Sequence, residues 1–380
     1  MNFYEKAIIK SEFFIKDSIL KYDQLRNYDF GPNKRDNVSG LSPFFSHRIL
    51  FEYHLIDKIL QMHQYSRVEK FIQEIFWRIY WKGWMEMRPS VWDNFLEGLN
   101  RIKFNKKDYE NAINARTKLS CFNDWVIELK EYNYLHNHTR MWFASIWIFT
   151  LKLPWQLGAK FFLENLKDGD ASSNTLSWKW VAGLQTKGKN YLANSRNIKK
   201  FTNNRYSNIP LVDTAFPKTE LFFPLIQKLP KNHNDKKYPN LVILDTDLFI
   251  SDRLDLMKKY EKIYYILLDN EDRTIQISKN VYNFKKEIMN DVSQSLPNSY
   301  LISSQNFKNQ INKLEGIDII YPNVGENLDF MAKISKENQL KTNYLYREID
   351  LFCWQYCQKG FFNFKKNIPF ILNEIRNKHL

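Results

Sequence analysis

The chain has 380 residues, of which 44% are hydrophobic and 16% aromatic, so it is long enough for a large core and two domains. Its formal net charge of +14 favours nucleic acid as a partner over a membrane, because no basic amphipathic anchor is present. A lysine-rich, solvated surface would give the same charge. Three cysteines cannot form a disulfide framework, and the first residues lack the apolar core of a signal peptide, so we expect a cytoplasmic protein.

Residues 1–229 are predicted to be helical. Aromatic and apolar residues recur at helical spacing, and Pro43, Pro89, Pro154 and Gly183 mark breaks or helix starts. The periodic stretches are LFEYHLIDKILQM, VEKFIQEIFWRIYWKGWMEM, TRMWFASIWIFTLKL and WQLGAKFFLENL. The most apolar run, MWFASIWIFTLKLPW, is too short to cross a bilayer and indicates a buried helix.

The pattern changes after residue 229. Residues 230–240 combine Pro, Asn and Lys with little apolar content and predict a linker. Residues 241–380 alternate short apolar runs with helical stretches, which is typical of a parallel sheet. The runs are LVILDTD, IYYILLDN, YLIS and GIDIIYPN. The predicted fold is therefore α plus α/β, with an N-terminal all-helical domain followed by a C-terminal, Rossmann-like parallel-sheet domain.

A phosphate-binding loop is one interpretation of NVSGLSPFF (37–45). The hydroxyls of Ser39 and Ser42 flank a glycine just before a helix, where hydroxyls and backbone amides favour an anion. Helix capping alone would also place a serine at this point. The pattern leaves both interpretations open.

The stretch QEIFWRIYW places an acid, a cation and two indoles on one helical face. Glu74, Trp77, Arg78 and Trp81 are spaced at i, i+3, i+4 and i+7. A helix face that carries two charged residues is not suited to a hydrophobic core. It is suited to the wall of a cleft that binds an aromatic, charged ligand. Ordinary packing remains the simpler interpretation of this stretch taken alone.

The stretch LHNHTRM adds a second polar face. Asn137 and Arg140 lie three residues apart on a predicted helix, and Arg140 could pair with an acid such as Asp168. Together with the preceding two stretches, these residues supply what a flavin or nucleobase site requires: amide and charged partners for ring edges, and flat side chains for stacking.

The segment DGDASSNTLSWKWVAG (168–183) resembles the flavin-binding segment of the photolyase/cryptochrome family, whose usual form is DGD, four residues ending in Asn, and then WxW. Four other stretches resemble motifs of that family. QEIFWRIYW is similar to its substrate-groove helix, LHNHTRM to its HNxxRM motif, VSGLSPFF to its phosphate loop, and PWQLGAKFFLENL to the segment before DGD. All five occur in the family's order within residues 20–205, so the chain is identified as a member of this family.

The resemblance implies that residues 20–205 bind FAD non-covalently in a U-shape. Asp168 would hold Arg140 across the flavin, and Asp170 would bond the ring edge or the adenine-side ribose. Asn174 would face flavin N5. The implied FAD-binding residues are Tyr22, Arg26, Ser39, Leu41, Ser42, Arg78, Asn137, Arg140, Asp168, Asp170 and Asn174.

The same resemblance implies roles in electron transfer and catalysis. Trp178 would be the first donor of an electron-hopping chain and Trp155 the second, while Trp125, Trp142 and Trp147 are candidates for the outermost donor. Two indoles would stack on a flipped pyrimidine dimer, and a carboxyl group would accept from its N–H or share a proton with it. The implied catalytic residues are Glu74, Trp77, Asn174 and Trp180.

Three functions fit this set of residues. The first is a lyase, a photolyase that repairs cyclobutane pyrimidine dimers by electron transfer from reduced FAD. The second is a cryptochrome-like blue-light photoreceptor without repair activity, and the third is a flavoprotein with no light role. The joint presence of Glu74 and both indole walls favours repair. Asn137 stands where relatives that repair (6-4) lesions carry a catalytic His, and His138 would point about 100° away on a helix, which favours cyclobutane chemistry.

The expected partner is UV-damaged DNA, bound by a monomer that needs no metal. Binding to phosphates would weaken with rising salt. The residues expected to contact phosphates are Lys82, Arg88, Lys187 and Lys189.

The order of the two domains departs from the family, whose members carry an α/β antenna domain before the helical one. LVILDTDLFISDRLDL resembles the family's first strand, and GFFNFKKNIPF resembles the segment that leads out of the antenna domain. We interpret the chain as a circular permutation, and an unrelated flavodoxin-like domain added by fusion is the alternative. The second domain lacks a GxGxxG fingerprint, so a dinucleotide is not expected there. Whether it holds a second, antenna chromophore is left open.

Overall fold

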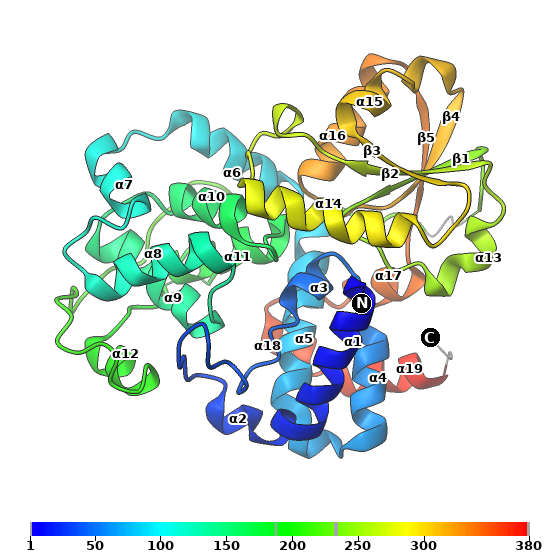
Figure 1. Cartoon of the computed structure of the whole chain (residues 1–380). Helices are drawn as coiled ribbons and strands as arrows, with labels where there is room; N and C mark the ends of the chain where they lie inside the picture. Colours follow the sequence, from blue (N-terminus) through cyan, green and yellow to red (C-terminus); the bar gives the residue numbers. More distant parts are fainter. Residues whose placement is uncertain (1, 187, 232–234, 378–380) are drawn as a thin grey trace.

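The computed structural model describes residues 2–186, 188–231 and 235–377. Figure 1 shows a helical part at the lower left and a twisted sheet with its own helices at the upper right. The predicted α plus α/β fold is confirmed. Within these described ranges, no helix is long and apolar enough to cross a membrane.

The helical part carries its apolar side chains on one side of each helix. In α5, for example, Phe71, Ile75 and Ile79 follow one another at four-residue spacing and are all buried. The helices are α1 (Phe3–Phe13), α2 (Tyr22–Leu25), α3 (Ser42–Ser46), α4 (Glu52–Met62), α5 (Tyr65–Glu86), α6 (Ser90–Arg101), α7 (Lys106–Ile113), α8 (Ser120–Tyr132), α9 (Asn137–Ser145), α10 (Trp155–Asn165), α11 (Ala171–Ala182) and α12 (Ser195–Phe201). Short π-helical turns extend α1 through Phe14–Ser18 and α9 through Ile146–Thr150.

The prediction of helices up to residue 229 is wrong at its end. The last helix of this part ends at Phe201, and the described residues between 202 and 239 form neither helix nor strand. Proline recurs in this segment at intervals of six to nine residues, which prevents a continuous helix. The prolines are Pro210, Pro217, Pro224, Pro230 and Pro239.

The α/β part is built on a sheet of parallel strands in the order β3-β2-β1-β4-β5. The strands are β1 (Asn240–Leu244), β2 (Lys262–Leu267), β3 (Ser299–Ser303), β4 (Gly316–Ile320) and β5 (Lys341–Leu345). The connecting helices are α13 (Leu254–Met257), α14 (Lys279–Ser293), α15 (Ser304–Lys308) and α16 (Glu326–Glu337). The sequence predicts the first four strands and misses β5.

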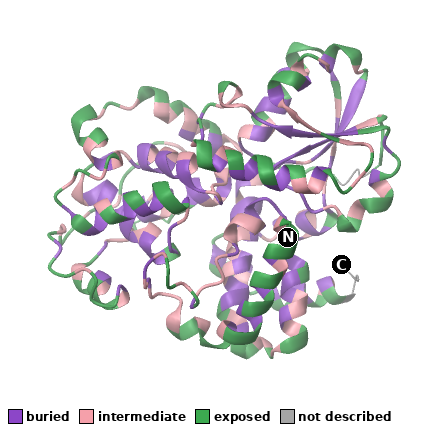
Figure 2. Ribbon diagram, viewed as in Figure 1, coloured by how far each residue is buried: buried purple, intermediate pink, exposed green. Residues whose placement is uncertain are grey.

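Both faces of the sheet are buried, and Figure 2 shows its central strands in purple. Because side chains alternate along a strand, Leu241 and Ile243 join the core that is continuous with the helical part, whereas Val242 and Leu244 join a second core. Because both faces of the sheet are buried, the central strands are apolar along most of their length.

The end of the chain returns to the helical part. Three helices follow β5: α17 (Glu348–Trp354), α18 (Phe361–Lys365) and α19 (Ile368–Asn377). Of these, α17 and α18 pack against α5. Since these helices lie within the predicted second domain but contact the first, the division of the chain at residues 229 and 240 stays a prediction.

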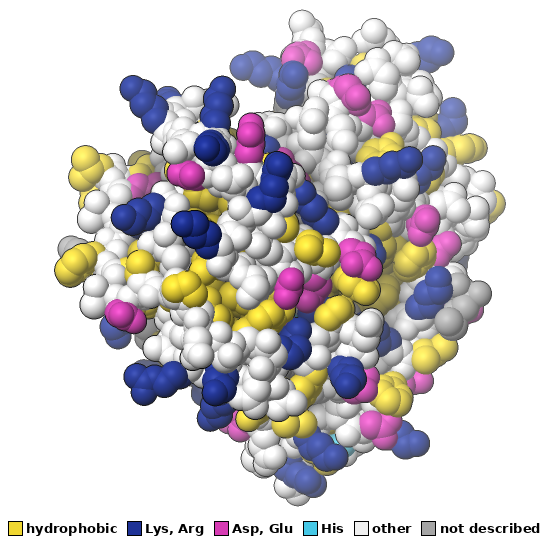
Figure 3. Space-filling view, turned by 60° about the vertical axis from the view of Figure 1, so that its left-hand side comes forward, with side chains coloured by type: hydrophobic (Ala, Val, Ile, Leu, Met, Phe, Trp, Pro, Cys, Tyr) yellow, Lys and Arg dark blue, Asp and Glu magenta, His cyan; other side chains and the backbone are white. Residues whose placement is uncertain are grey.

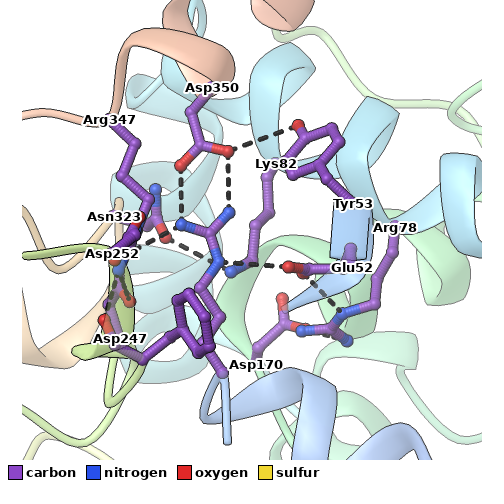
Figure 4. Close-up of polar contacts among 12 residues, drawn as sticks. Glu52, Tyr53, Arg78, Lys82, Asp170, Asp247, Asp252, Asn323, Arg347 and Asp350 are labelled. Atoms are coloured by element: carbon purple, nitrogen blue, oxygen red, sulfur yellow. Dashed lines mark hydrogen bonds and ion pairs between the residues drawn. The ribbon is translucent and has the colours of Figure 1, made fainter. Parts of the chain in front are cut away.

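A buried ion network joins the two parts (Figure 4). The guanidinium of Arg48 contacts Asp350 at 2.6 and 2.7 Å, Asp247 at 3.1 Å and Glu52 at 3.3 Å. Asp247 follows β1, and Asp350 belongs to α17. Asp247 also forms an ion pair with Arg347 at 2.7 Å, so the buried carboxylates of this network lie beside guanidinium groups. Buried charges require such pairing.

Candidate functional site

The side chain of Asp168 lies where three separate segments meet. Its Oδ2 accepts hydrogen bonds from Arg140 of α9, at 2.8 Å, and from the hydroxyl of Ser42 at the start of α3. Its backbone oxygen accepts from Ser46 at 3.0 Å. The pairing of Arg140 with Asp168 predicted from the sequence is therefore confirmed. The DGD loop, the HNxxRM helix and the serine loop form one cluster.

The DGD segment is shaped by local helix chemistry. Asp170 is the N-cap of α11, and its carboxylate accepts from the backbone N–H of Ser173 at 2.8 Å. The helix ends at Gly183, which has a φ of 84° and closes the C-terminus in the left-handed conformation. Between these caps, Asn174, Trp178 and Trp180 are carried by a single rigid element.

Asp170 also holds a charge pair with α5. Its carboxylate lies 3.0 Å from Arg78 Nη1. Burial raises the pKa of Asp170, but Arg78 and Lys82 outweigh burial and hold that pKa below its ordinary value. Figure 4 shows Arg78 between Asp170 and Glu52.

Asn174 and the two tryptophans of α11 have different environments. Asn174 is buried, and its Nδ2 donates to the carbonyl of Ala159 at 2.9 Å, so its Oδ1 can act as an acceptor. Trp178 is buried, with no hydrogen-bond partner for Nε1. Trp180 is half-buried and stacks on Tyr191, with ring centroids 5.8 Å apart.

The predicted substrate helix places Glu74 and Trp77 next to other segments. Glu74 forms an ion pair with Arg26 of the loop after α2. Burial raises the pKa of Glu74, although Arg26 acts in the opposite direction. Trp77 stacks on Phe361 of α18, with ring centroids 3.6 Å apart and an interplanar angle of 12°. Because Trp77 remains half-buried, part of the indole is still accessible.

The other predicted binding residues are less closely engaged. Leu41 is buried at the start of α3, and Ser39 Oγ accepts weakly from its backbone N–H at 3.4 Å. Tyr22 packs edge-on against Phe71. Asn137 is exposed at the start of α9 and does not join the cluster around Asp168.

Two of the predicted phosphate contacts are wrong. Lys82 is 3% exposed and Arg88 is 6% exposed, so neither lies on a basic surface. Lys82 donates to Asn323 of the α/β part at 3.3 Å, and burial with nearby Arg48 and Arg78 lowers its pKa to about 8. Arg88 donates to the carbonyl of Gln358 at 2.7 Å. Lys189 is exposed, and Lys187 lies outside the described residues.

A cavity of about 80 Å³ lies between the DGD loop and the sheet. Its lining includes Asp170 and Lys82 from the helical part, Thr246 after β1, and Asn323 and Asn327 after β4. The carboxyl ends of β1 and β4 are the switch point of this sheet, where open α/β folds bind ligands. Over the described part of the chain, no cluster of His, Cys, Asp and Glu is able to hold a metal ion.

Arg48 is the central residue that the sequence does not reveal. It has a φ of 49° and is buried among acids from both parts of the chain. In the sequence it is an isolated base within SHRILFEYHL, and its partners Asp247 and Asp350 are about 200 and 300 positions away. No local pattern distinguishes it from a surface arginine.

Comparison with known proteins shows what part of the chain resembles. Residues 71–209 match the family described as the FAD binding domain of DNA photolyase. The chain is 26% identical over 191 residues to the deoxyribodipyrimidine photo-lyase of Buchnera aphidicola, covering 48% of this chain and 39% of that one. It is 29% identical over 119 residues to the Streptomyces griseus enzyme of the same name, covering 31% and 26%. The chain thus spans less than half the length of these relatives.

Two solved structures resemble the chain at low identity. A bacterial class III photolyase from Agrobacterium tumefaciens has 22% identity and a TM-score of 0.46, over 53% of this chain and 42% of that one. The Synechocystis cryptochrome has 19% identity and a TM-score of 0.47, over 52% and 43%.

Within the helical part, residues 71–209 are thus similar to the FAD-binding domain of DNA photolyase. This match confirms the resemblance found in the motifs of the sequence, and the matched domain is one that binds FAD.

The cluster around Asp168 fits such a cofactor. Asp168 Oδ1 and Arg78 Nη2 are buried polar atoms without a hydrogen-bond partner in the protein. Buried atoms of this kind are rare unless a ligand or water satisfies them. Asp168 Oδ1 is a free acceptor and Arg78 Nη2 a free cationic donor, and both lie near the serine loop. A flavin nucleotide requires such groups.

Proposed function

We propose that the chain is a light-dependent DNA-repair flavoprotein, a photolyase that splits cyclobutane pyrimidine dimers by electron transfer from reduced FAD. The observation that carries the proposal is the position of Glu74, which lies on the same helix as Trp77. Glu74 forms an ion pair with Arg26, and burial raises the pKa of its carboxyl group. A carboxyl group of this kind is suited to sharing a proton with a base whose charge changes.

The binding roles follow from the cluster described above. Bound FAD supplies the light-absorbing ring system and the electron. Arg140, fixed by Asp168, presents a cation, and Asn174 presents its Oδ1 because Ala159 holds its Nδ2. The residues proposed to hold FAD are Tyr22, Arg26, Ser39, Leu41, Ser42, Arg78, Asn137, Arg140, Asp168, Asp170 and Asn174.

The substrate is proposed to be a dimer flipped out of DNA. Trp77 and Trp180 each have one stacking partner inside the protein, Phe361 and Tyr191, and each remains half-buried, so each indole can offer its remaining surface to a flat ligand. Enzymes that act on a base take it out of the helix and stack it between such side chains. DNA binding also accords with the net charge of +14.

Contacts with the DNA backbone are proposed to come from scattered basic residues such as Lys189. Figure 3 shows Lys and Arg side chains distributed around a band of hydrophobic side chains on one face, with acids between them. A distributed set of cations gives binding that weakens as salt is raised.

A cryptochrome-like photoreceptor is the second candidate. Phe361 covers one face of Trp77 at 3.6 Å, which narrows the access that a repair enzyme needs at this wall. A photoreceptor needs the flavin site but no open lesion pocket.

The deciding experiment is blue-light repair of a dimer-containing oligonucleotide by flavin-loaded, reduced protein. We expect repair by the wild type and strong loss in Glu74→Ala and Trp180→Ala. Glu69→Ala, a change of the same kind on α5, is the matched control and should repair normally. Full flavin loading without repair by the wild type would favour the photoreceptor. Repair unaffected by both substitutions would mean that the pocket lies elsewhere.

A further inference from the structure

Asn137 and His138 are neighbours at the start of α9 but lie in different environments. Asn137 is exposed, whereas His138 is 8% exposed and its ring packs on Trp142, with centroids 4.1 Å apart. The proposed function assigns no role to this histidine. A buried ring that carries two polar nitrogens needs a partner for each of them.

Both ring nitrogens of His138 have a partner from a distant segment. Nδ1 lies 2.9 Å from the carbonyl oxygen of Asn27, and Nε2 lies 3.3 Å from the hydroxyl of Tyr191. Because a carbonyl oxygen only accepts, Nδ1 carries the proton of the ring. In the neutral ring Nε2 is then an acceptor, and the phenol of Tyr191 donates to it.

The protonation states of the two side chains fit this arrangement. Burial lowers the pKa of His138; Arg26 acts in the same direction, while the carbonyl of Asn27 and the carboxylate of Asp29 act in the opposite one. The ring is therefore neutral at neutral pH. Burial raises the pKa of Tyr191 to about 12, so the phenol keeps the proton that it donates.

Each partner of the histidine is tied to a residue of the proposed lesion pocket. Tyr191 stacks on Trp180, with ring centroids 5.8 Å apart and an interplanar angle of 24°. Asn27 directly follows Arg26, which forms the ion pair with Glu74. The histidine thus connects the indole of Trp180 to the loop that holds the acid.

The backbone of Tyr191 is fixed separately. Its N–H donates to the carbonyl of Val181 at 3.1 Å, and Val181 is the residue that follows Trp180 in α11. One end of the tyrosine is therefore attached to α11 and the other end, the hydroxyl, to His138. The ring between these two ends is a fixed surface for the indole.

We propose that His138 and Tyr191 are positioning residues of the lesion pocket: the hydrogen bond between them holds the Tyr191 ring, and that ring holds the indole of Trp180 in the plane on which a flat base can stack. The inference rests on the proposed function and adds the residues that set the geometry of its pocket. An indole that is already held in place loses less freedom when a ligand binds than one that must be ordered by the ligand.

Three variants separate the hydrogen bond from packing. Tyr191→Phe keeps the ring on Trp180 and removes only the hydroxyl. His138→Leu makes no side-chain hydrogen bond, whereas His138→Gln again offers both an N–H and an acceptor. Tyr206→Phe is the matched control, because its partly buried tyrosine donates to Asp124 at 3.0 Å, a contact outside the pocket.

The first measurement requires neither DNA nor light. The FAD-loaded protein is labelled with fluorotryptophan, and the fluorine NMR signal of Trp180 is identified by its absence from Trp180→Phe. We expect Tyr191→Phe and His138→Leu to shift and broaden this signal, and His138→Gln and Tyr206→Phe to leave it as in the wild type. An unchanged signal in both Tyr191→Phe and His138→Leu would overturn the proposal.

The second measurement is the affinity, in the dark, for an oligonucleotide that contains a dimer and for the same oligonucleotide without one. Loss of the hydrogen bond in Tyr191→Phe should weaken binding of the dimer-containing DNA about three- to tenfold and leave binding of undamaged DNA unchanged. His138→Gln should bind both as the wild type does. Equal losses in His138→Gln and His138→Leu would contradict the proposal, because the shape of the ring and not its hydrogen bonds would then be what matters.

Failure of the proposed function gives a different result. If the wild type does not prefer the dimer-containing oligonucleotide, the pocket is not one for a dimer, and the fluorine spectra still decide whether His138 holds Trp180. Flavin content is measured first in every variant. If His138→Leu does not fold, Tyr191→Phe, which removes only a hydroxyl, decides the case.

Discussion

Phe361 lies almost parallel to Trp77, with ring centroids 3.6 Å apart, and so joins a segment near the end of the sequence to the helix that carries Glu74. Two more contacts join the same segments, because Tyr80 of α5 donates to the carbonyl of Lys359, and Arg88, just after α5, donates to that of Gln358. The face of α5 proposed to bind substrate is therefore shaped in part by residues 358–361.

Replacing Phe361 tests how much this contact stabilises the protein. Phe361 is 5% exposed, so Phe361→Ala should lower the free energy of unfolding by about 3–5 kcal/mol. Phe362, its neighbour, is 78% exposed, and Phe362→Ala should change stability by no more than about 0.5 kcal/mol. Urea unfolding followed by tryptophan fluorescence measures both. Equal effects would show that the stacking contact contributes little.

Removal of the charge on Asp168 should release the flavin. Asp168→Asn keeps the size of the side chain but leaves half-buried Arg140 without its anionic partner and weakens the hydrogen bond from Ser42. We expect purified Asp168→Asn to contain little FAD, measured by absorbance after denaturation. Asp255→Asn changes an exposed acid and should retain the cofactor. Full flavin content in both variants would contradict the assignment.

The buried network at Arg48 should be required for the two parts to stay together. Arg48→Met leaves Asp350 and Glu52 without their partner, so we expect the free energy of unfolding to fall by about 3–5 kcal/mol. Arg101→Met, at an exposed ion pair, should have almost no effect. Differential scanning calorimetry compares the two. A small effect of Arg48→Met would mean that water reaches the network and replaces the guanidinium.

Acidification should destabilise the fold through His136. Burial lowers the pKa of His136 to about 4, while Asp29 acts in the opposite direction; Arg35, His138 and Arg140 also act on it. The unfolded chain binds this proton near pH 6.5 and the folded chain only near pH 4, so stability falls as the pH drops through that window. The loss is on the order of 3 kcal/mol.

His136→Asn isolates this effect. His136 Nδ1 accepts from the N–H of His138 at the start of α9, and Asn is also a good N-cap but does not titrate. Urea unfolding midpoints from pH 7 to pH 4 should therefore fall less in the variant than in the wild type. Parallel pH profiles would assign the acid sensitivity to other groups.

Local patterns predicted the elements that local chemistry determines. Strands β1, β2 and β4 are apolar runs buried on both faces, whereas β5, KTNYL, is an edge strand with Lys341 exposed and only Asn343 and Leu345 buried. Because polar and apolar residues are mixed in β5, its sequence does not show the apolar run that predicts a buried strand. The sequence predicts that Glu74 and Trp77 share a helix face, because their spacing is helical. It also predicts the pairing of Arg140 with Asp168, because both belong to motifs that resemble those of one family.

What the sequence could not predict depends on contacts between distant segments. Lys82 is expected from the sequence to contact phosphates at the surface, but it is buried and donates to Asn323, which is 241 positions away. The same holds for Phe361, which lies 284 positions after Trp77. The residue pattern around Lys82 or around Phe361 does not indicate which side of α5 a distant segment will cover.

The return of α17 and α18 to α5 also has a consequence for synthesis on the ribosome, which proceeds from the N-terminus. When residues 1–205 have emerged, α5 is present but the segment that covers Trp77 is not, and it follows only after the whole sheet has been made. During that interval an apolar face of the helical part is open to water and to other chains. The flavin-binding motifs are thus complete early in translation, whereas the helix beside them is covered only after residue 361 has been added.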